Sequence, residues 1–272
     1  MNGKSPAGGR RLPLAVLRAG GRLLPVLLLL LVWQVLTQAD LVDQAFLPSV
    51  TSILAALYDL LRGGEVSGNL GISLFRNFAG LALGITAGVL IGVAMATSGA
   101  ADGFFGPLVG VTYSLPKSAL VPLFLLWFGI GTTTDVAAVF LACLLPIVVH
   151  TYQGIKGVQP VLLWSARAMG TPPGTLLWRI MIPAALPLIL TGVRIALGFS
   201  FILTVSAEMI ASTDGIGKLI FMYGENGSYS YMFAAIGVVA AVASVADRAL
   251  LAVMRVVLRW HEFAQHEAGE VA

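Results

Sequence analysis

The sequence contains little charge. Only 11% of its 272 residues are charged, whereas 58% are hydrophobic, and the mean hydropathy is +0.91. A soluble domain averages about 25% charged residues, so this composition excludes a water-soluble globular protein. Each bilayer span needs roughly 20 apolar residues, which leaves room for about six spans with short loops and no separate soluble domain. We therefore expect an all-α integral membrane protein with six transmembrane helices.

Several catalytic and metal-binding motifs are also missing. The single cysteine, Cys143, excludes an intramolecular disulfide and a cysteine-based metal cluster, and we expect it to be a small buried hydrophobe. A G-x-x-x-x-G-K-[ST] phosphate loop is absent, because the similar run G-I-G-K at 215–218 lacks the first glycine. His150, His261 and His266 have no metal-ligand spacing. We expect no bound metal or cofactor and no ATP hydrolysis by this chain.

Six apolar segments are the predicted spans. They cover about residues 23–39, 77–95, 108–128, 136–149, 186–207 and 231–253. Pro116 and Pro122 interrupt the third segment. The first follows a basic leader but precedes five further spans, which favours an uncleaved signal anchor. The predicted organisation is a basic N-terminal tail (1–22), a first span with an external helix (23–66), a transmembrane domain (67–254) and a C-terminal tail (255–272).

Lysine and arginine placement predicts the orientation. With the N-terminus inside, ten of these residues lie in cytosolic segments and three outside, which satisfies the positive-inside rule. The ten are Lys4, Arg10, Arg11, Arg18, Arg22, Lys156, Arg167, Arg179, Arg255 and Arg259, and the three are Arg62, Arg76 and Lys218. Both termini should therefore be cytosolic. The positive charge reflects topology and does not indicate a nucleic-acid partner.

Two helix patterns concern packing. Between the first two spans, leucines and isoleucine recur at helical spacing and Gly63 and Gly64 follow, which predicts an amphipathic helix at the outer surface. Its apolar positions are Ile53, Leu54, Leu57, Leu60 and Leu61. In the second span, glycines at every fourth position form a stripe that lets another helix approach closely. These are Gly80, Gly84, Gly88 and Gly92.

The segment 164–187 is polar, cationic and interrupted by prolines. Gly170 can end a helix in a left-handed conformation, and Pro172 and Pro173 should prevent its continuation. We expect Pro183 and Pro187 to fix the start of the fifth span. A short helix with defined ends on the cytosolic side predicts a docking element for a cytosolic partner, and the alternative is an ordinary basic loop.

In this segment the chain resembles the inner-membrane permease subunits of bacterial ABC importers. Their signature is Glu-Ala-Ala, three residues, Gly, nine residues and Ile-x-Leu-Pro. Here Trp164, Ser165 and Ala166 occupy the triplet, Gly170 follows, and I-M-I-P at 180–183 ends the motif. The departures are Trp164, Ser165 and Ile182, and the missing carboxylate removes a salt bridge at residue 164. The resemblance implies that ATPase coupling involves Trp164, Ser165, Ala166, Arg167, Ala168 and Gly170.

Other segments resemble the branch of this family that handles nitrate, sulfonates and taurine. They lie at 115–131, 191–198 and 207–220. The resemblance implies the type I importer fold in the bacterial inner membrane and a path for a small anion. Its partners would be an ATPase dimer that binds ATP and Mg²⁺, an extracytoplasmic binding protein and a second copy of the chain. The alternative is a stand-alone secondary transporter, although no internal repeat is evident.

Polar residues within the predicted spans are candidates for lining the path. Lys117 follows Pro116 where the third span is broken, and Ser200 and Glu208 lie in the fifth span. A serine hydrolase is excluded for Ser200 because the sixth span contains no histidine. For Lys117 and Glu208, structural pairing is the alternative to contact with solute. We favour structural pairing for Arg194 and leave both possibilities open for Asp247.

Overall fold

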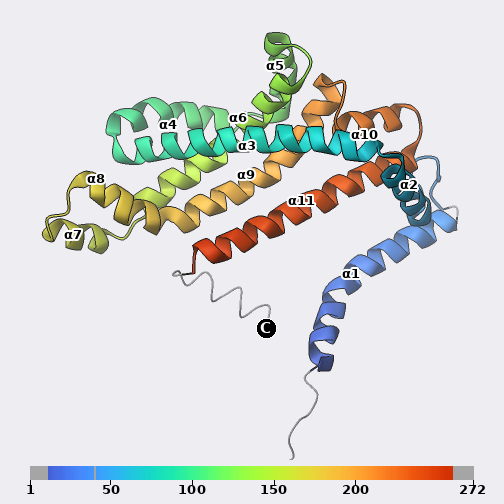
Figure 1. Cartoon of the computed structure of the whole chain (residues 1–272), viewed down its shortest axis with the longest axis horizontal. Helices are drawn as coiled ribbons and strands as arrows, with labels where there is room; N and C mark the ends of the chain where they lie inside the picture. Colours follow the sequence, from blue (N-terminus) through green and yellow to red (C-terminus); the bar gives the residue numbers. More distant parts are fainter. Residues whose placement is uncertain (1–11, 40, 260–272) are drawn as a thin grey trace, which may run out of the picture.

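The computed structural model describes residues 12–39 and 41–259, and every regular element in these ranges is a helix (Figure 1). The body consists of three long helices, α3 (Glu65–Thr97), α6 (Thr132–Lys156) and α9 (Ile182–Ala211). Around them lie α1 (Leu12–Gln38), α2 (Val50–Gly63), α4 (Gly99–Tyr113), η1 (Lys117–Leu120), α5 (Val121–Phe128), α7 (Pro160–Ala168), α8 (Pro173–Leu176), η2 (Leu177–Met181), α10 (Ile216–Glu225) and α11 (Tyr229–Val257). The all-α prediction is confirmed.

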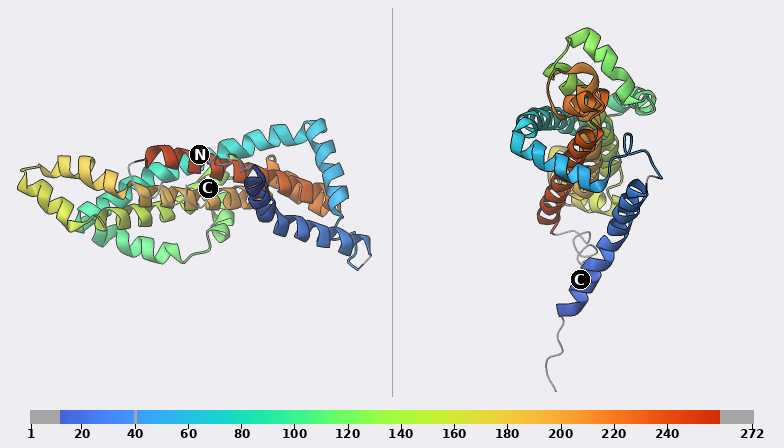
Figure 2. Two further views of the ribbon diagram at one scale, coloured as in Figure 1. Left: turned by 90° about the horizontal axis from the view of Figure 1, so that it is seen from below. Right: turned by 90° about the vertical axis from the view of Figure 1, so that its right-hand side faces the viewer.

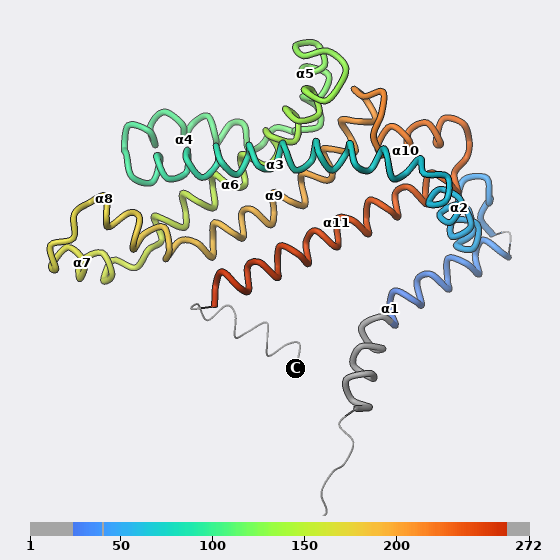
Figure 3. The backbone as a smooth tube through the Cα atoms, in the orientation of Figure 1, coloured from blue at the N-terminus to red at the C-terminus, as the bar shows by residue number. Residues whose placement is uncertain are grey.

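The molecule is elongated, with different short helices at its two ends (Figures 1 and 2). The α7–α8 turn forms one tip, whereas α2 and α10 cover the opposite end of the long helices. From that second end α1 leads away from the body (Figure 3). At 1.5 Å per residue α9 alone is about 45 Å long, enough to separate the two ends by a bilayer.

The predicted glycine stripe is where α3 meets α6. A Cβ atom added to any of the four glycines would lie within 3 Å of a side chain of α6, closer than real Cβ atoms approach. The added Cβ atom would lie 2.6 Å from Val139 at Gly80, 2.7 Å from Cys143 at Gly84, 2.8 Å from Ile147 at Gly88 and 2.6 Å from Thr151 at Gly92. Because the missing side chains bring two backbones together, the packing role is confirmed, and Cys143 is fully buried as expected.

The predicted third span is sharply bent. α4 and the pair η1–α5 meet at 98°. Pro116 has an extended backbone conformation (ψ 106°) just before η1, which explains the break. The helical segment also begins earlier than predicted, at Gly99, because Ser98 caps α4 by accepting a hydrogen bond from the Ala101 N–H at 3.4 Å.

The amphipathic helix after the first span is present as α2. Gly64 ends it with a left-handed conformation (φ 74°). Ala56 and Leu60 are buried in a cluster with α10 and α11, together with Ile53 and Leu57. Leu54 and Leu61 lie outside this cluster and are 58% and 62% exposed.

Apolar helices long enough to span a bilayer occupy the places of the predicted second to sixth spans, if the bent third span counts as one. The described residues contain four helices long and apolar enough to cross a bilayer, or five if the bent pair counts as one. The predicted first span corresponds to α1, whose described apolar part, Leu24–Gln38, is shorter than a full span. Of the predicted tails, residues 1–11 and 260–272, with His261 and His266, lie outside the described residues.

Candidate functional site

The tip helix α7 presents an exposed apolar surface. Pro160 starts the helix, where its missing N–H removes no hydrogen bond. Trp164 is 66% exposed and Met169, just beyond the helix, is 79% exposed. Trp178, after the turn, is also exposed. Large exposed apolar side chains mark interaction sites, so this tip is a candidate docking surface and differs from an ordinary polar loop.

Most of the residues expected to couple to an ATPase share this exposure. Ser165, Arg167, Ala168 and Gly170 are exposed, as is Trp164. Ala166 differs, because only 1% of its surface is accessible and it packs inward. Within the predicted set, Ala166 is therefore the buried position, while its neighbours are exposed.

The end of α7 is rigid. Gly170 has φ 77°, as predicted from its position in the motif. Its N–H donates to Arg167 O at 2.9 Å, and the Thr171 N–H donates to Ala166 O at 3.1 Å. These two bonds form a Schellman motif, which satisfies carbonyls left free at the helix end. The signature glycine thus fixes the direction of the chain after the docking surface.

The return into the membrane differs from the prediction. The helix starts at Pro173 and continues through α8, η2 and α9 to Ala211, so Pro183 and Pro187 lie inside it. The turn η2 is a π-helix, in which the Ile182 N–H donates to Leu177 O. Pro183 has no N–H to donate, and the wider turn just before it accommodates the missing bond. Pro183 occupies the first turn of α9, as expected, but the continuous helical segment starts earlier, at Pro173, and the expectation was wrong for Pro187, which lies inside α9.

A buried ion cluster lies at the opposite end of the long helices. The Arg76 guanidinium of α3 contacts Glu208 of α9 at 3.1 Å and Asp135 of α6 at 3.3 Å. It also contacts Asp214, in the turn before α10, at 2.6 Å. Arg76 is 3% exposed, and the Asp135 and Glu208 side chains are fully buried. One cation thus joins three long helices and the turn.

Neutral groups complete the coordination of Glu208. Ser73 Oγ lies 2.8 and 2.7 Å from the two carboxylate oxygens, and the Gly217 N–H donates to Oε2 at 2.9 Å. Ser73 Oγ accepts from the Ile216 N–H at 2.8 Å. Gly215 has φ 103°, and a Cβ there would overlap the carboxylate. The polar turn A-S-T-D-G-I-G at 211–217 therefore wraps around Glu208.

The sequence alone did not reveal this cluster. Arg76 was placed in the segment before the second span, but α3 begins earlier, at Glu65, so Arg76 lies inside the helix and is buried. Asp135 fell just before the predicted fourth span and received no role. Both lie just before the first residue of a predicted span, Arg76 before residue 77 and Asp135 before residue 136. An arginine at the start of the second span and an aspartate at the start of the fourth carry opposite charges, and this was the sequence signal that could have predicted an ion pair.

Ser200 and Glu208 are both fully buried in this conformation. Ser200 Oγ donates to Leu197 O at 2.7 Å and lies 3.2 Å from Asn77 Oδ1. Asn77 Nδ2 donates in turn to Thr204 Oγ1 at 3.1 Å. These bonds tie α3 to α9. Contact of Ser200 or Glu208 with solute stays a prediction and requires another conformation of the chain.

Lys117 lies at the bend between α4 and η1. Its Nζ donates to Tyr113 O at 2.5 Å, one of the carbonyls freed where α4 ends. It also lies 5.1 Å from the Tyr113 ring centroid. A cation at a helix C-terminus is favourable, so the lysine stabilises the break in the helix here. Contact of Lys117 with solute stays a prediction.

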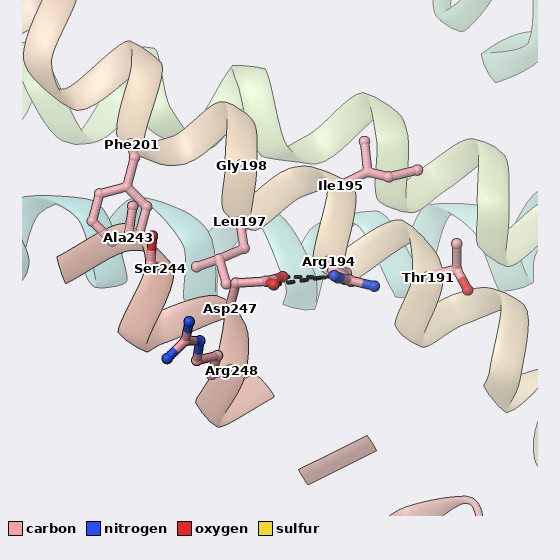
Figure 4. A pocket seen from close by; sticks show the side chains of 10 residues that line it. All are labelled: Thr191, Arg194, Ile195, Leu197, Gly198, Phe201, Ala243, Ser244, Asp247 and Arg248. Carbon is pink, nitrogen blue, oxygen red and sulfur yellow. Dashed lines mark hydrogen bonds and ion pairs between the residues drawn. The ribbon is translucent and has the colours of Figure 1, made fainter. Parts of the chain in front are cut away.

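A pocket of about 680 Å³ opens between α9 and α11 (Figure 4). Arg194 and Asp247 face each other across it, with Nε to Oδ1 at 2.8 Å and a guanidinium nitrogen to Oδ2 at 3.1 Å. The expected pairing of Arg194 is thus observed. Arg248 lies beside Asp247 on α11 and also lines the pocket, as do the apolar side chains of Leu197 and Phe201.

The sequence is similar to known transport proteins over most of its length. It is 32% identical to the taurine transport system permease protein TauC of Escherichia coli (strain K12), over 86% of each chain. It is 30% identical to the putative aliphatic sulfonates transport permease protein SsuC of Bacillus subtilis (strain 168), over 88% of this chain and 87% of the relative.

Solved structures share the fold. A chain of the MetNI methionine ABC transporter in an inward-facing conformation matches 73% of this protein and 95% of its own length, with a TM-score of 0.56 and 19% identity. A chain of an amino acid ABC transporter crystallised with histidines gives a TM-score of 0.57 at 19% identity, covering 75% of this protein and 97% of its own length. At this identity the likeness concerns the fold alone.

The family match agrees with the geometry of the tip. Residues 84–258 match the family described as binding-protein-dependent transport system inner membrane component, a range that includes α7, Gly170 and the long helices α6 and α9. The comparisons give no support to a stand-alone secondary transporter. The chain therefore belongs to the family of binding-protein-dependent transport system inner membrane components, the permease subunits of ABC importers.

Proposed function

We propose that this permease subunit carries small organic anions of the sulfonate class across the bacterial inner membrane. The names of its relatives support this class, since they are described as taurine and aliphatic sulfonate permeases. A solute-binding protein would deliver the solute outside, and two copies of this chain would form the path. Both termini would be cytosolic, in agreement with the positive-inside count.

The proposal assigns ATP binding and hydrolysis to a separate subunit that docks on α7. The observation that carries it is the exposed apolar tip, in which Trp164 and Met169 face outward while Ala166 packs inward. A rigid Schellman turn at Gly170 connects this surface to the helix that continues into α9. A displacement of the tip would thus be transmitted along one continuous helix into the membrane, which is what a coupling element requires.

Thiol cross-linking tests the docking surface. The chain would be co-expressed with the ATPase of its own gene neighbourhood, after a cysteine is placed by Met169→Cys and joined to nearby lysines with a maleimide–amine reagent. Cys143 is fully buried and contributes little background. We expect a cross-linked product that contains the ATPase.

Two control variants define the surface. Ala166→Cys places the thiol on the inward side of the same helix, and Leu126→Cys places it on α5, where the residue is 79% exposed. Neither should capture the ATPase. Equal capture from Leu126→Cys, or none from Met169→Cys, would contradict docking at the tip.

Ligand stabilisation of the partner binding protein tests the solute class. Its melting temperature would be measured with taurine, ethanesulfonate, nitrate and methionine at equal concentrations. We expect sulfonates to raise it most, because a ligand stabilises the state that binds it. Stabilisation by methionine alone would contradict the proposed class.

A further inference from the structure

The pocket between α9 and α11 lies between the ends of both helices, lined by side chains from Thr191 to Phe201 and from Ala243 to Arg248. Only Ala234 and Ala235 of α11 are buried, near its start, so the rest of the helix packs loosely and leaves the pocket open. At 1.5 Å per residue, Arg248 lies about 13 Å from the end of α11 at Val257 and about 28 Å from its start at Tyr229. The pocket is an open groove away from both ends of α11, and the Arg194 and Asp247 side chains in it are 42% and 39% exposed.

The pocket lining carries more positive than negative charge. It contains two guanidiniums and one carboxylate, and Asp247 binds Arg194 through both of its oxygens. In the view of Figure 4, Arg194 and Arg248 lie on opposite sides of that carboxylate. Within the part of the chain that the structure describes, Arg248 forms no ion pair. Ionisable groups on a membrane-spanning helix mark candidate solute pathways, which makes Arg248 a candidate for binding an anion.

The other polar groups of the pocket cannot replace Arg248 as a donor. Ser244 Oγ donates to Ala240 O at 2.7 Å, and Thr191 Oγ1 donates to Pro187 O at 2.9 Å, so both hydroxyl protons are used within their own helices. The remaining walls are apolar, from Leu197 and Phe201, with no side chain at Gly198. The lining thus offers cationic donors beside a surface suited to a short hydrocarbon chain.

We propose that this pocket is a binding station for the solute on its way through the membrane. Arg248 would bind the sulfonate oxygens with Arg194 as a second cation, and the carbon chain would contact Leu197 and Phe201. The volume of about 680 Å³ lies within the range of small-molecule pockets. This inference rests on the proposed solute class.

Asp247 limits how tightly the pocket can bind an anion. By neutralising Arg194, the carboxylate limits the positive potential and hence the affinity for an anion. A transport path requires such a limit, since the solute must be able to leave again. The geometry thus points to a weak site that selects anions without trapping them.

The test is uptake of radiolabelled taurine by the complete importer in proteoliposomes, with its ATPase and loaded binding protein. Arg248→Gln removes the unpaired charge, and Arg255→Gln makes the same change in an exposed residue of α11 outside the pocket. We expect Arg248→Gln to lower uptake roughly tenfold or more, the effect of losing a charged hydrogen bond, with Arg255→Gln near wild type. Arg248→Lys should retain part of the activity.

A second variant separates binding from simple structural damage. Asp247→Asn removes the negative charge that pairs with Arg194, so we expect a lower KM for the loaded binding protein together with a lower maximal uptake rate. A merely destabilised protein would lose rate without a gain in apparent affinity. The amount of folded complex recovered from the membrane is measured for each variant.

The outcomes distinguish this inference from the proposed function. If the wild-type importer transports taurine and Arg248→Gln matches Arg255→Gln, the station is wrong and the solute class stands. If the wild type transports no sulfonate, both are wrong.

A lipid phosphate has similar oxyanion chemistry, so the thermal stability of the purified complex is also measured with added phosphatidylglycerol. If this lipid stabilises the wild type and Arg248→Gln abolishes that effect while leaving uptake unchanged, a headgroup occupies the pocket and the station is overturned. Equal lipid stabilisation of the wild type and the variant, with loss of uptake in the variant, supports the station.

Discussion

Two charged clusters join the helices of this permease, and they differ chiefly in burial. In the first, Arg76 contacts Asp135 and Glu208, and at most 3% of these side chains is exposed. In the second, Arg194 binds Asp247 with better geometry, but the two side chains are 42% and 39% exposed. The same guanidinium–carboxylate chemistry therefore serves under opposite conditions of solvation.

The difference in burial indicates a different role for each cluster. Removing one partner of a buried pair leaves a charge without compensation, so the Arg76 cluster can only hold the helix ends together while it is intact. A half-exposed pair costs little to open and can exchange its partner for a solute. We infer that the first cluster fixes the structure at one end and that the second allows passage.

The largest expected effect comes from Arg76→Met. The variant leaves the buried carboxylates of Asp135 and Glu208 without a cation, at a cost of about 3–5 kcal/mol. We expect little folded protein and a much lower melting temperature in detergent, measured by fluorescence-detected size-exclusion chromatography.

Arg76→Lys serves as the matched control. It keeps the charge but loses the planar fork that contacts several carboxylates, so we expect an intermediate melting temperature. If Arg76→Met were as stable as the wild type, the cluster would have no structural role and the contrast between the two clusters would disappear.

Gly215→Ala should have the next largest effect. The glycine has φ 103°, and a methyl group would overlap the Glu208 carboxylate. Strain of this kind costs on the order of 1–3 kcal/mol, which should lower the melting temperature less than Arg76→Met does. Gly174→Ala, at an exposed glycine with open space around it, is the control and should leave the melting temperature nearly unchanged. Equal melting temperatures for the two variants would show that the turn can shift away from Glu208 to accommodate the methyl group.

Much of the fold followed from local signals. The glycine stripe predicted the contact of α3 with a neighbouring helix, because a helix face without side chains allows another helix backbone to pack closely against it. The left-handed Gly170 followed from its place in a motif. The continuous helix through Pro183 did not follow from local signals. The rule that proline interrupts α-helical hydrogen bonding does not anticipate a π-helical turn that accommodates the proline.

The buried cluster needed information that local patterns do not contain. Arg76 and Glu208 are 132 residues apart in the sequence, and their contact depends on how three helices pack. Hydropathy also places charged residues in loops, because it measures transfer of an isolated residue and ignores a partner inside the protein. Lys117 illustrates the same limit: its contact with the Tyr113 carbonyl depends on a bend whose angle the prolines alone do not define.

Ser73→Ala tests a neutral part of the buried cluster. The hydroxyl lies within hydrogen-bond distance of both Glu208 oxygens and accepts from the Ile216 N–H, so the variant leaves buried groups unpaired at about 1–3 kcal/mol. We expect a smaller loss of melting temperature than for Arg76→Met. Ser67→Ala, at an exposed serine of the same helix, is the control. A loss as large as that of Arg76→Met would mean that the hydroxyl, and not the cation, holds the cluster together.

The smallest effect on stability is expected for Arg194→Met, which makes the change of Arg76→Met in the exposed cluster. An exposed ion pair contributes at most about 1 kcal/mol, because water solvates the remaining carboxylate and salt screens the pair. The melting temperature should fall only slightly, and raising the salt concentration should reduce the difference from wild type. This result requires that water reaches Asp247 in the assembled importer. A loss as large as that of Arg76→Met would instead mean that Asp247 is sealed from water, and a pocket without water access could not serve as a station for an anion.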